Sequence, residues 1–474
     1  MLVTLRPYQT RGVENLRAAY RRGKRAPVYV LPTGGGKSIV FCYIAESASA
    51  RQKRVWVLVH RQELLGQASR SLEALGVRHG IIAPGYSITH SPVQVASVHT
   101  LLRRFGRVPH APDLIIIDEA HHAIAGTWRK IIAQYPNAAL LGVTATPIRL
   151  DGAGLGIECG GVFDSMVMGP SVQELTQQGF LVPAKVYAPP SQLNLEGVRS
   201  RGGDFEHTEM ARRVDRPQIT GDAVEHYRRL CNGKPAIAFC ASVAHADHVA
   251  EQFQRAGFRS VRLDGMMTDL ERRTAVEGLA RGQLQVLTSC DLVSEGFDCP
   301  AVTAAILLRP TKSLSLYLQQ VGRALRPMPG KESAIILDHV GNVMRHGLPD
   351  EQHPWTLDGE PPVEAKDGEG DELSVRQCPS CYAVHEWADT CPHCGHEYVV
   401  VGRTIQQVEG TLTELTPAQV EALRRMRRAE VKEALTAEAL EAIARKRGYK
   451  PQWVKHVLNA RQQRRRNPFG RSFD

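Results

Sequence analysis

The sequence lacks any long run of apolar residues. No stretch approaches the ~20 consecutive apolar residues that a membrane-spanning helix requires. The segment Met1–Tyr20 also lacks an apolar stretch followed by small residues, which is the pattern of a secretory leader. These two absences exclude a membrane span and predict a chain that works in the cytoplasm.

The charge is unevenly distributed along the 474 residues. The net charge is +10, yet residues 421–474 alone hold 15 Lys or Arg against six Asp or Glu, a net of +9. Residues 350–372 hold nine acidic residues against one Lys, a net of −8. A concentrated positive tail favours a polyanionic partner. The alternative is an ordinary solvated helical surface or an element that docks a protein.

Ten cysteines fall into two groups. Six are scattered, several of them inside apolar runs, as expected of buried thiols in a reducing compartment. The other four follow the spacing C-x2-C-x9-C-x2-C and are Cys378, Cys381, Cys391 and Cys394. Four thiolates can close a tetrahedral Zn²⁺ site with no open position, so a structural zinc site is predicted. A redox pair is the alternative, although a single C-x-x-C is its usual form.

Short apolar runs bounded by turn residues recur in two groups, with helix-like stretches between them. The first group is Val28–Leu31, Val55–Val59, Val93–Val98, Leu114–Ile117 and Ala139–Val143. The second group is Ala236–Cys240, Ser260–Leu263, Gln285–Ser289, Val302–Leu308 and Ala334–Leu337. Buried strands that alternate with helices predict parallel sheets covered on both faces.

The fold class predicted is therefore α/β, with two tandem parallel-sheet domains at residues 1–165 and 184–346. Residues 349–373 are rich in proline and acids and are predicted to form an extended, disordered linker. A zinc ribbon-like module with the four cysteines follows at 374–400, and a basic helical tail occupies 411–474.

A glycine-rich segment, Leu31–Ser38, follows the first strand and opens the helix Ile39–Ala45. Glycines let the backbone wrap around phosphate oxygens with its N–H groups pointing inward. We expect Lys37 to reach the β- and γ-phosphates and the Ser38 hydroxyl to hold Mg²⁺. The residues predicted to form this phosphate loop are Thr33, Gly34, Gly35, Gly36, Lys37 and Ser38.

A second buried strand ends in two acidic residues, Asp118 and Glu119. A carboxylate at such a strand tip can coordinate Mg²⁺, and we assign this role to Asp118. The adjacent Glu119 can take a proton from an attacking water. In isolation an Asp-Glu pair at a strand end is a solvated turn, but here it lies downstream of a phosphate loop.

Together these segments resemble the motifs of superfamily 2 helicases of the DEAD/DEAH-box type. Pro32–Ser38, Asp118–His121 and Thr144–Pro147 resemble motifs I, II and III. Leu5–Gln9 resembles the motif that recognises adenine. The remaining motifs resemble Ia, Ib, IV, V and VI, in that order, and are Arg61–Gln62, Ser97–Thr100, Phe239–Ser242, Ser294–Asp298 and Gln319–Arg326.

The resemblance implies two RecA-like domains that bind ATP in the cleft between them. It also implies that Gln9 contacts the adenine base and that Gly296 and Asp298 belong to the nucleotide site. Arg323 and Arg326 are expected to stabilise charge on the transferring phosphoryl group. The predicted catalytic residues are Lys37, Asp118, Glu119, Arg323 and Arg326. His121, Thr144 and Thr146 are expected to link the ATP site to the strand-binding face.

Within the superfamily, four segments look most like the bacterial and phage helicases related to RadD: Leu5–Gln9, Gly296–Asp298, Leu308–Thr311 and Ile336–His339. The implied activity is that of an ATP hydrolase that moves along or opens a nucleic acid as a monomer, with DNA favoured over RNA. An RNA helicase, a duplex translocase and an ATP-switched clamp are the alternatives. Arg61, Thr100 and Thr288 are candidate phosphate contacts or, equally, capping and turn residues. No separate nuclease constellation is found.

Overall fold

The structure, a computed structural model, describes most of the chain. It covers residues 4–188 apart from 61, 109, 124–125 and 150–151, and residues 223–358 apart from 266 and 291–298. It also covers short stretches between 200 and 214 and between 375 and 458. The chain divides into a larger unit, Met1–Ala188 with Val198–Pro361, and a smaller unit, Pro189–Gly197 with Pro362–Asp474.

The first domain of the larger unit is built on a seven-stranded sheet in which the neighbouring strands pair in parallel. Its order is β3-β4-β2-β5-β6-β1-β7. The strands are β1 (Pro27–Val30), β2 (Val55–Val59), β3 (His79–Ile82), β4 (Val93–Ser97), β5 (Leu114–Asp118), β6 (Ala139–Thr144) and β7 (Ser165–Met168). β1 and β2 are buried along their whole length, as the apolar runs predict for a sheet covered on both faces.

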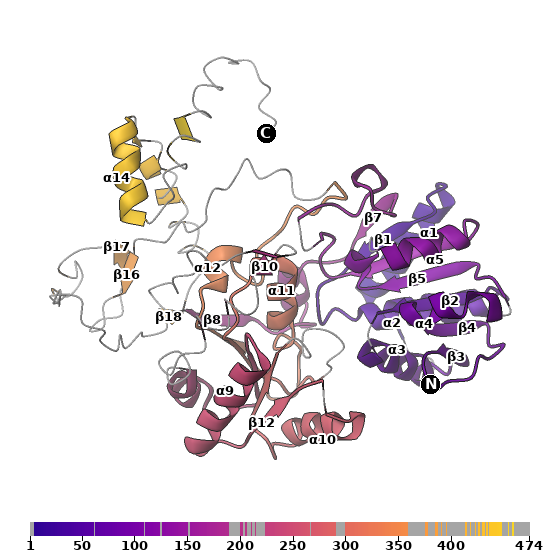
Figure 1. Ribbon diagram of the computed structural model, residues 1–474, viewed down its shortest axis with the longest axis horizontal. Coiled ribbons are helices and arrows are strands. Elements are labelled where there is room, and N and C mark those ends of the chain that lie inside the picture. Colours follow the sequence, from indigo (N-terminus) through magenta and orange to yellow (C-terminus); the bar gives the residue numbers. More distant parts are fainter. Residues whose placement is uncertain are drawn as a thin grey trace. The chain divides into compact units, whose positions relative to one another are not determined.

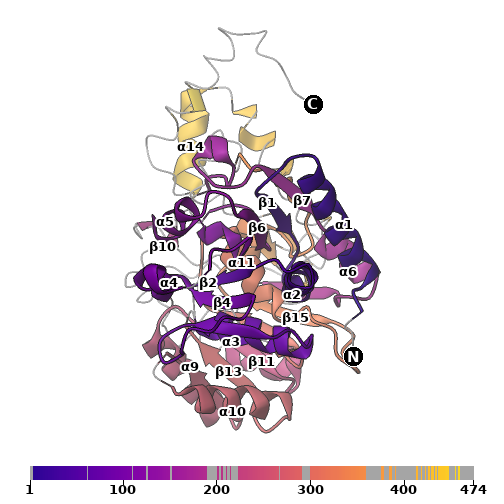
Figure 2. The same cartoon turned by 90° about the vertical axis from the view of Figure 1, so that its right-hand side faces the viewer.

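Helices cover both faces of this sheet. They are α1 (Pro7–Arg21), α2 (Lys37–Ser49), α3 (Gln62–Ala74), α4 (Val98–Arg103) and α5 (Gly126–Gln134). α1 contacts α2 and α2 contacts α3, whereas α4 contacts α5. Figure 2 shows α1 and α4 on opposite sides of the strands. Leu101 of α4 and Ile131 of α5 belong to the apolar core that also contains Trp56 of β2.

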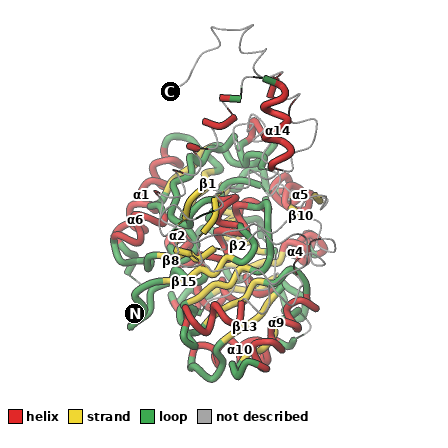
Figure 3. The backbone as a smooth tube through the Cα atoms, turned by 90° about the vertical axis from the view of Figure 1, so that its left-hand side faces the viewer, coloured by secondary structure: helices red, strands yellow, loops and turns green. Residues whose placement is uncertain are grey.

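The second domain repeats this architecture. Its parallel strands follow the order β12-β13-β11-β14-β15-β8. They are β8 (Ala184–Ala188), β11 (Ala236–Phe239), β12 (Ser260–Leu263), β13 (Val286–Ser289), β14 (Ala304–Leu307) and β15 (Ala334–Asp338). The helices include α9 (Val243–Arg255), α10 (Asp269–Ala280), α11 (Leu314–Gly322) and α12 (Asn342–His346). Figures 1 and 3 show these strands with α9 and α10 outside them. Two parallel-sheet α/β domains are thus confirmed.

Two connections join the domains within the larger unit. The first contains α6 (Val172–Gln177) and leads from β7 to β8. The second is residues 348–358, which we call the strap. The Gly347 carbonyl before it accepts a hydrogen bond from the Tyr317 hydroxyl at 2.9 Å in the second domain. At its far end the Leu357 carbonyl accepts from the Gly156 N–H at 2.8 Å in the first domain.

The structure of the strap differs from what was predicted for the start of the acidic linker. Residues 349–373 were expected to be extended and disordered, yet 349–358 contact both domains. Leu357 packs against the apolar core of the first domain, and Pro349 and Glu351 line a cavity together with Leu318 and Val321 of α11. The composition pointed to a linker because acids and prolines dominate it, while a few apolar anchors are enough to hold the chain. Residues 359–373 lie outside the described residues.

The smaller unit contains the antiparallel pair β16 (Val375–Gln377) and β17 (Val384–Glu386), the short strand β18 (Thr413–Glu414) and the helix α14 (Ala437–Arg447). Leu440, Ile443 and Ala444 of α14 form a small apolar core with Val454. The four cysteines of the predicted zinc module lie outside the described residues. No described helix has the length and apolar character that a membrane crossing demands.

Candidate functional site

The phosphate-loop segment connects β1 to the first residue of α2, Lys37. Gly34 and Gly36 have φ angles of 87° and 84°, in the left-handed region where a Cβ is disfavoured. The glycines therefore allow the turn that brings the chain from the buried strand to the start of the helix. A loop between a parallel strand and a helix N-terminus presents backbone N–H groups suited to an anion.

Lys37 lies among the other predicted catalytic side chains. Its Nζ donates to the Leu31 carbonyl at 3.4 Å. Loss of solvent lowers the pKa of Lys37, while the nearby Glu119 and Asp118 carboxylates oppose that shift. Arg323 and Arg326 also act on Lys37, lowering its pKa further. Two segments that are far from Lys37 in sequence, Asp118–Glu119 and Arg323–Arg326, are thus close enough to act on its charge.

Asp118 and Glu119 stand at the end of β5, and both are buried. Glu119 has a φ of 50°, which is unfavourable for a residue with a side chain. Its backbone N–H donates to the Asp118 Oδ1 at 3.0 Å. A non-glycine residue held in this conformation at a strand tip is the kind of strain found at active sites.

A network of polar groups runs from Glu119 into the second domain. His121 Nδ1 lies 3.6 Å from Glu119 Oε2 and 3.1 Å from the Thr144 hydroxyl. The Thr144 hydroxyl donates to the Thr146 carbonyl at 2.9 Å. The Thr146 hydroxyl then donates to the Ser315 hydroxyl of α11 at 2.6 Å. Ser315 was not found from the sequence, because a lone serine in a helix carries no motif.

The arginines of motif VI lie at the end of α11, which spans Leu314–Gly322. Arg323 is buried and Arg326 is half-buried. A Cβ added at Gly322 would lie only 2.6 Å from the Thr33 Cβ, so glycine is required for this close approach to the phosphate loop. The structure therefore sets the two predicted arginines beside the predicted phosphate site.

The predicted adenine-recognition motif is also fixed to the phosphate loop. The Tyr8 hydroxyl donates to the Gly35 carbonyl at 2.8 Å. The Gln9 amide donates to the same carbonyl at 3.3 Å, and its Oε1 accepts from the Arg6 N–H at 3.0 Å. Gln9 is buried. The motif at the start of α1 thus contacts the loop that precedes α2.

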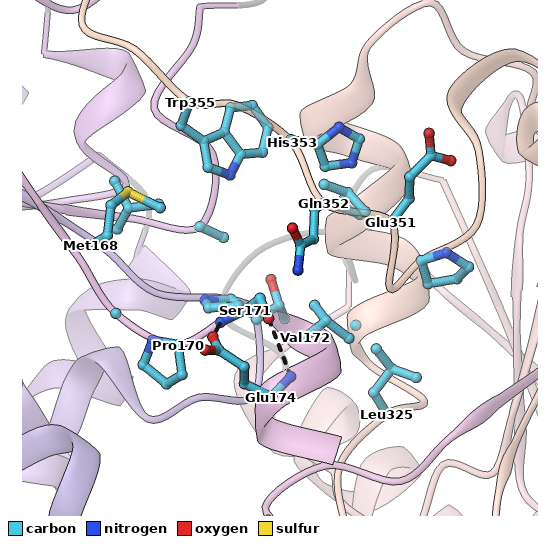
Figure 4. A pocket seen from close by; sticks show the side chains of 18 of the residues that line it. Met168, Pro170, Ser171, Val172, Glu174, Leu325, Glu351, Gln352, His353 and Trp355 are labelled. Carbon is cyan, nitrogen blue, oxygen red and sulfur yellow. Dashed lines mark hydrogen bonds between the residues drawn. The ribbon is translucent and has the colours of Figure 1, made fainter. Parts of the chain in front are cut away.

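A cavity of about 330 Å³ adjoins the phosphate loop at Pro32 and Thr33. Figure 4 shows side chains from three segments around it: Met168 and Pro170–Val172 with Glu174, then Leu325, and Glu351–His353 with Trp355 of the strap. The dashed lines mark the capping box of α6, in which Ser171 and Glu174 exchange hydrogen bonds. Both connections between the domains therefore line one cavity.

The structure does not bring all of the predicted site residues to this place. Gly296, Asp298 and Arg61 lie outside the described residues, as do the four cysteines. Thr288 is fully buried and its hydroxyl donates to the Ala246 carbonyl at 2.7 Å, so it is a structural residue rather than a phosphate contact. Thr100 is buried in α4, and its role as a phosphate contact stays a prediction. Ser38 lies at the start of α2, 3.5 Å from the Gln67 amide nitrogen.

Comparisons with known proteins bear on this arrangement. The family model described as "Type III restriction enzyme, res subunit" matches residues 2–149, and "Helicase conserved C-terminal domain" matches residues 222–328. A Lactococcus phage protein, "51.5 kDa protein", is 35% identical over 370 residues, covering 78% of this chain and 77% of its own length.

A yeast protein and a solved structure agree with these matches. The "Putative ATP-dependent helicase IRC3" of Saccharomyces cerevisiae is 28% identical over 358 residues, 71% of this chain and 51% of its own. The chain thus spans about half of that relative. A putative HsdR subunit fragment of a type I restriction enzyme from Vibrio vulnificus YJ016 has a TM-score of 0.57 at 20% identity. The alignment covers 72% of this chain and 65% of that one.

The solved structure supports the fold, while the sequence matches support the family. The narrower likeness to RadD-like helicases stays a prediction. With the restriction-enzyme res subunit model and the helicase C-terminal model matched in order, and with a 35% identical relative aligned over most of both chains, the chain belongs to the DEAD/DEAH-like helicases of superfamily 2, which are ATP-hydrolysing enzymes.

Proposed function

We propose that this chain hydrolyses ATP at the cleft between its two domains and uses the energy to move along DNA. One observation carries the proposal: the phosphate loop of the first domain lies against motif VI of the second. A Cβ added at Gly322 would lie 2.6 Å from the Thr33 Cβ, and one added at Gly34 would lie 3.4 Å from the Arg326 Cγ. An arginine supplied across a cleft makes hydrolysis depend on domain closure.

The oxygen donors present fit a magnesium ion. Mg²⁺ prefers carboxylate, hydroxyl and phosphate oxygens and retains several waters. The Ser38 hydroxyl at the start of α2 and the buried Asp118 carboxylate would hold it. When bound, the ion neutralises charge between the β- and γ-phosphates. We propose that Lys37 and the N–H groups of Thr33–Ser38 hold the phosphates in place.

Glu119 is our candidate general base. It is buried, held in a strained backbone conformation and contacted by His121. A buried carboxylate beside the phosphate loop is placed to take a proton from an attacking water. A polar network connects this base to the second domain through His121, Thr144, Thr146 and Ser315.

We favour DNA as the nucleic acid along which the chain moves, because one matched family model is that of a restriction enzyme subunit. Contacts to the phosphate backbone position a strand without reading its sequence. RNA remains the alternative that the same fold could accept. A clamp that only binds ATP is disfavoured because Glu119 and the two arginines form a complete hydrolytic set.

ATP turnover measured with single-stranded DNA, duplex DNA, forked DNA and RNA as separate stimulants tests this proposal. We expect DNA to stimulate turnover most, and Lys37→Ala to abolish it with every stimulant. Stimulation by RNA alone would overturn the choice of DNA. An unstimulated enzyme that binds ATP tightly would favour the clamp.

We also propose that Cys378, Cys381, Cys391 and Cys394 hold one structural Zn²⁺. The first pair lies in sequence between β16 and β17, which form an antiparallel pair with Val375 opposite Glu386. Four thiolates satisfy the tetrahedral preference of Zn²⁺. Elemental analysis of protein purified under reducing conditions should give one zinc per chain, and Cys381→Ser should remove it. A metal-free wild-type protein would refute the assignment.

The remaining expectations concern setting and partners. We propose a cytoplasmic enzyme that acts as a monomer on the strand. We further propose that the basic tail, 411–474, adds affinity for nucleic acid or docks a protein.

A further inference from the structure

Three consecutive residues between α6 and β8 each contact a different part of the proposed ATP site. Phe180 meets the adenine-recognition motif: the Arg6 guanidinium lies 4.8 Å from the centre of its ring, and the Tyr8 ring centre lies 5.0 Å away. This segment belongs to the first connection between the domains. It carries no recognised motif, and sequence reasoning missed it.

Leu181 meets the phosphate loop. A Cβ added at Gly34 would lie 2.9 Å from the Leu181 Cδ2, so the leucine covers the outside of the loop. Val182 meets motif VI, because its backbone N–H donates to the Leu325 carbonyl at 2.9 Å. Leu325 directly precedes Arg326. The short segment Phe180–Val182 therefore contacts the adenine-recognition motif, the phosphate loop and motif VI, which carries the catalytic arginines.

The surroundings of Phe180 have the chemistry of a base-binding pocket. An aromatic ring and a planar guanidinium both stack on the flat face of a base. The Tyr8 hydroxyl and the Gln9 amide fix this corner to Gly35 of the phosphate loop. A base sandwiched between ring and guanidinium needs about 7 Å between them, since each layer takes roughly 3.5 Å. The observed 4.8 Å leaves no room for it.

We propose that a purine base of the nucleotide stacks on Phe180, separates it from Arg6, and thereby shifts the segment Phe180–Val182 and the motif VI arginines. The inference rests on the proposed ATP site and adds a base-binding residue to it. Because Phe180 lies on the connection between the domains, any movement of its ring acts on the backbone that holds Leu325. A ligand changes a conformational equilibrium by such differential contacts.

Steady-state ATPase kinetics of the full-length chain test this proposal with Phe180→Ala and Phe180→Trp. Loss of one stacked ring typically weakens base binding by about five- to a hundredfold. We expect Phe180→Ala to raise the KM for ATP by about tenfold and to lower kcat at saturating ATP. We expect Phe180→Trp to restore KM to within about threefold. Tyr86→Ala, an exposed aromatic in the first domain, is the matched control.

Two further ligands separate base recognition from phosphate binding. Inorganic tripolyphosphate, used as a competitive inhibitor, should have the same inhibition constant in wild type and Phe180→Ala. CTP should lose less affinity than ATP, because a pyrimidine offers a smaller face for stacking. An unchanged KM for ATP, or an equal weakening of tripolyphosphate, would overturn the proposal. If Lys37→Ala still abolishes turnover in that case, the ATP site stands and only the role of Phe180 fails.

Discussion

Glu119 shows at the scale of one residue how a fold prepares a reactive group. Its carboxylate is buried beside His121, and its backbone is held at a φ of 50°. Burial and strain both cost stability, so they persist only where the surrounding structure enforces them. The same residue would be an ordinary turn acid if β5 ended at the surface.

We predict that Glu119→Gln lowers kcat by at least about a hundredfold, the usual contribution of a general base. Binding of ATP should remain close to wild type, because Gln keeps the shape and Lys37 still meets the phosphates. The comparison is kcat beside a Kd for ATP measured on the same preparation. Glu158→Gln, at an exposed position, is the control. Near-normal turnover in Glu119→Gln would rule out this assignment.

At the scale of elements, the strap is an irregular segment that links the two domains. It leaves α12 in the second domain and ends on the first domain through the Leu357 contacts. With the α6 connection it gives the larger unit two links between domains, and both links line one cavity. Two links restrict relative motion to fewer directions than one flexible link does.

Shortening the apolar anchor of the strap should loosen it. We predict that Leu357→Ala destabilises the first domain by about 1–2 kcal/mol, below the usual cost for a fully buried leucine because this one is partly exposed. The strap should also become more sensitive to protease. Denaturant unfolding and limited proteolysis measure the two effects. Asp358→Asn, which keeps the backbone contact to Cys159, should behave as wild type. Equal behaviour of Leu357→Ala and Asp358→Asn would mean that the strap is not anchored there.

At the scale of the whole molecule, acid sensitivity follows from a buried histidine. Desolvation, with a smaller effect of His226, lowers the pKa of His339 to about 3. An unfolded histidine titrates near ~6.5, so the unfolded chain binds more protons between these values. Above pH ~6.5 His339 is neutral in both states and burying it does not reduce the free energy of unfolding. As the pH falls from ~6.5 toward ~3, the unfolded chain gains a proton and the free energy of unfolding decreases.

We predict that the unfolding free energy of the wild type falls by ~2 kcal/mol from this residue between pH 7 and pH 5. His339→Phe should flatten the pH dependence by about one proton, because a phenyl ring keeps much of the packing but does not titrate. Denaturant midpoints across that pH range measure the slope. His248→Asn removes an exposed histidine and should leave the slope unchanged. Identical slopes for wild type and His339→Phe would contradict the prediction.

We predict that the basic tail determines how nucleic-acid binding by the whole chain responds to salt. The tail after residue 421 holds a net charge of +9, so it should neutralise nucleic-acid phosphates and release counterions. Deleting it should reduce the salt dependence of binding, by roughly 0.7–0.9 log units per log unit of salt for each phosphate that the tail neutralises. The KM for nucleic acid should rise while kcat changes little. A salt titration of binding by full-length and truncated protein checks this, and an unchanged slope would point to protein docking instead.

The sequence by itself determined the local and repetitive features. Apolar runs such as Val55–Val59 identified strands, because burial on both faces of a parallel sheet leaves a continuous signal. The glycine-rich loop before Lys37 was evident for a similar reason, since its backbone geometry requires glycine. Two strands of the first sheet, β3 and β7, were missed because their runs are short and partly polar.

Only the tertiary structure decided which distant residues meet. Three contacts join segments that are far apart in sequence. Phe180 contacts Arg6, Ser315 accepts a hydrogen bond from Thr146, and Leu357 packs against the core of the first domain. Such contacts leave no local pattern, because an isolated aromatic, serine or leucine fits many environments equally well. The burial of Thr288 shows the reverse case. As a candidate phosphate contact it was expected at the surface, but the depth of a side chain is set by the elements that pack over it.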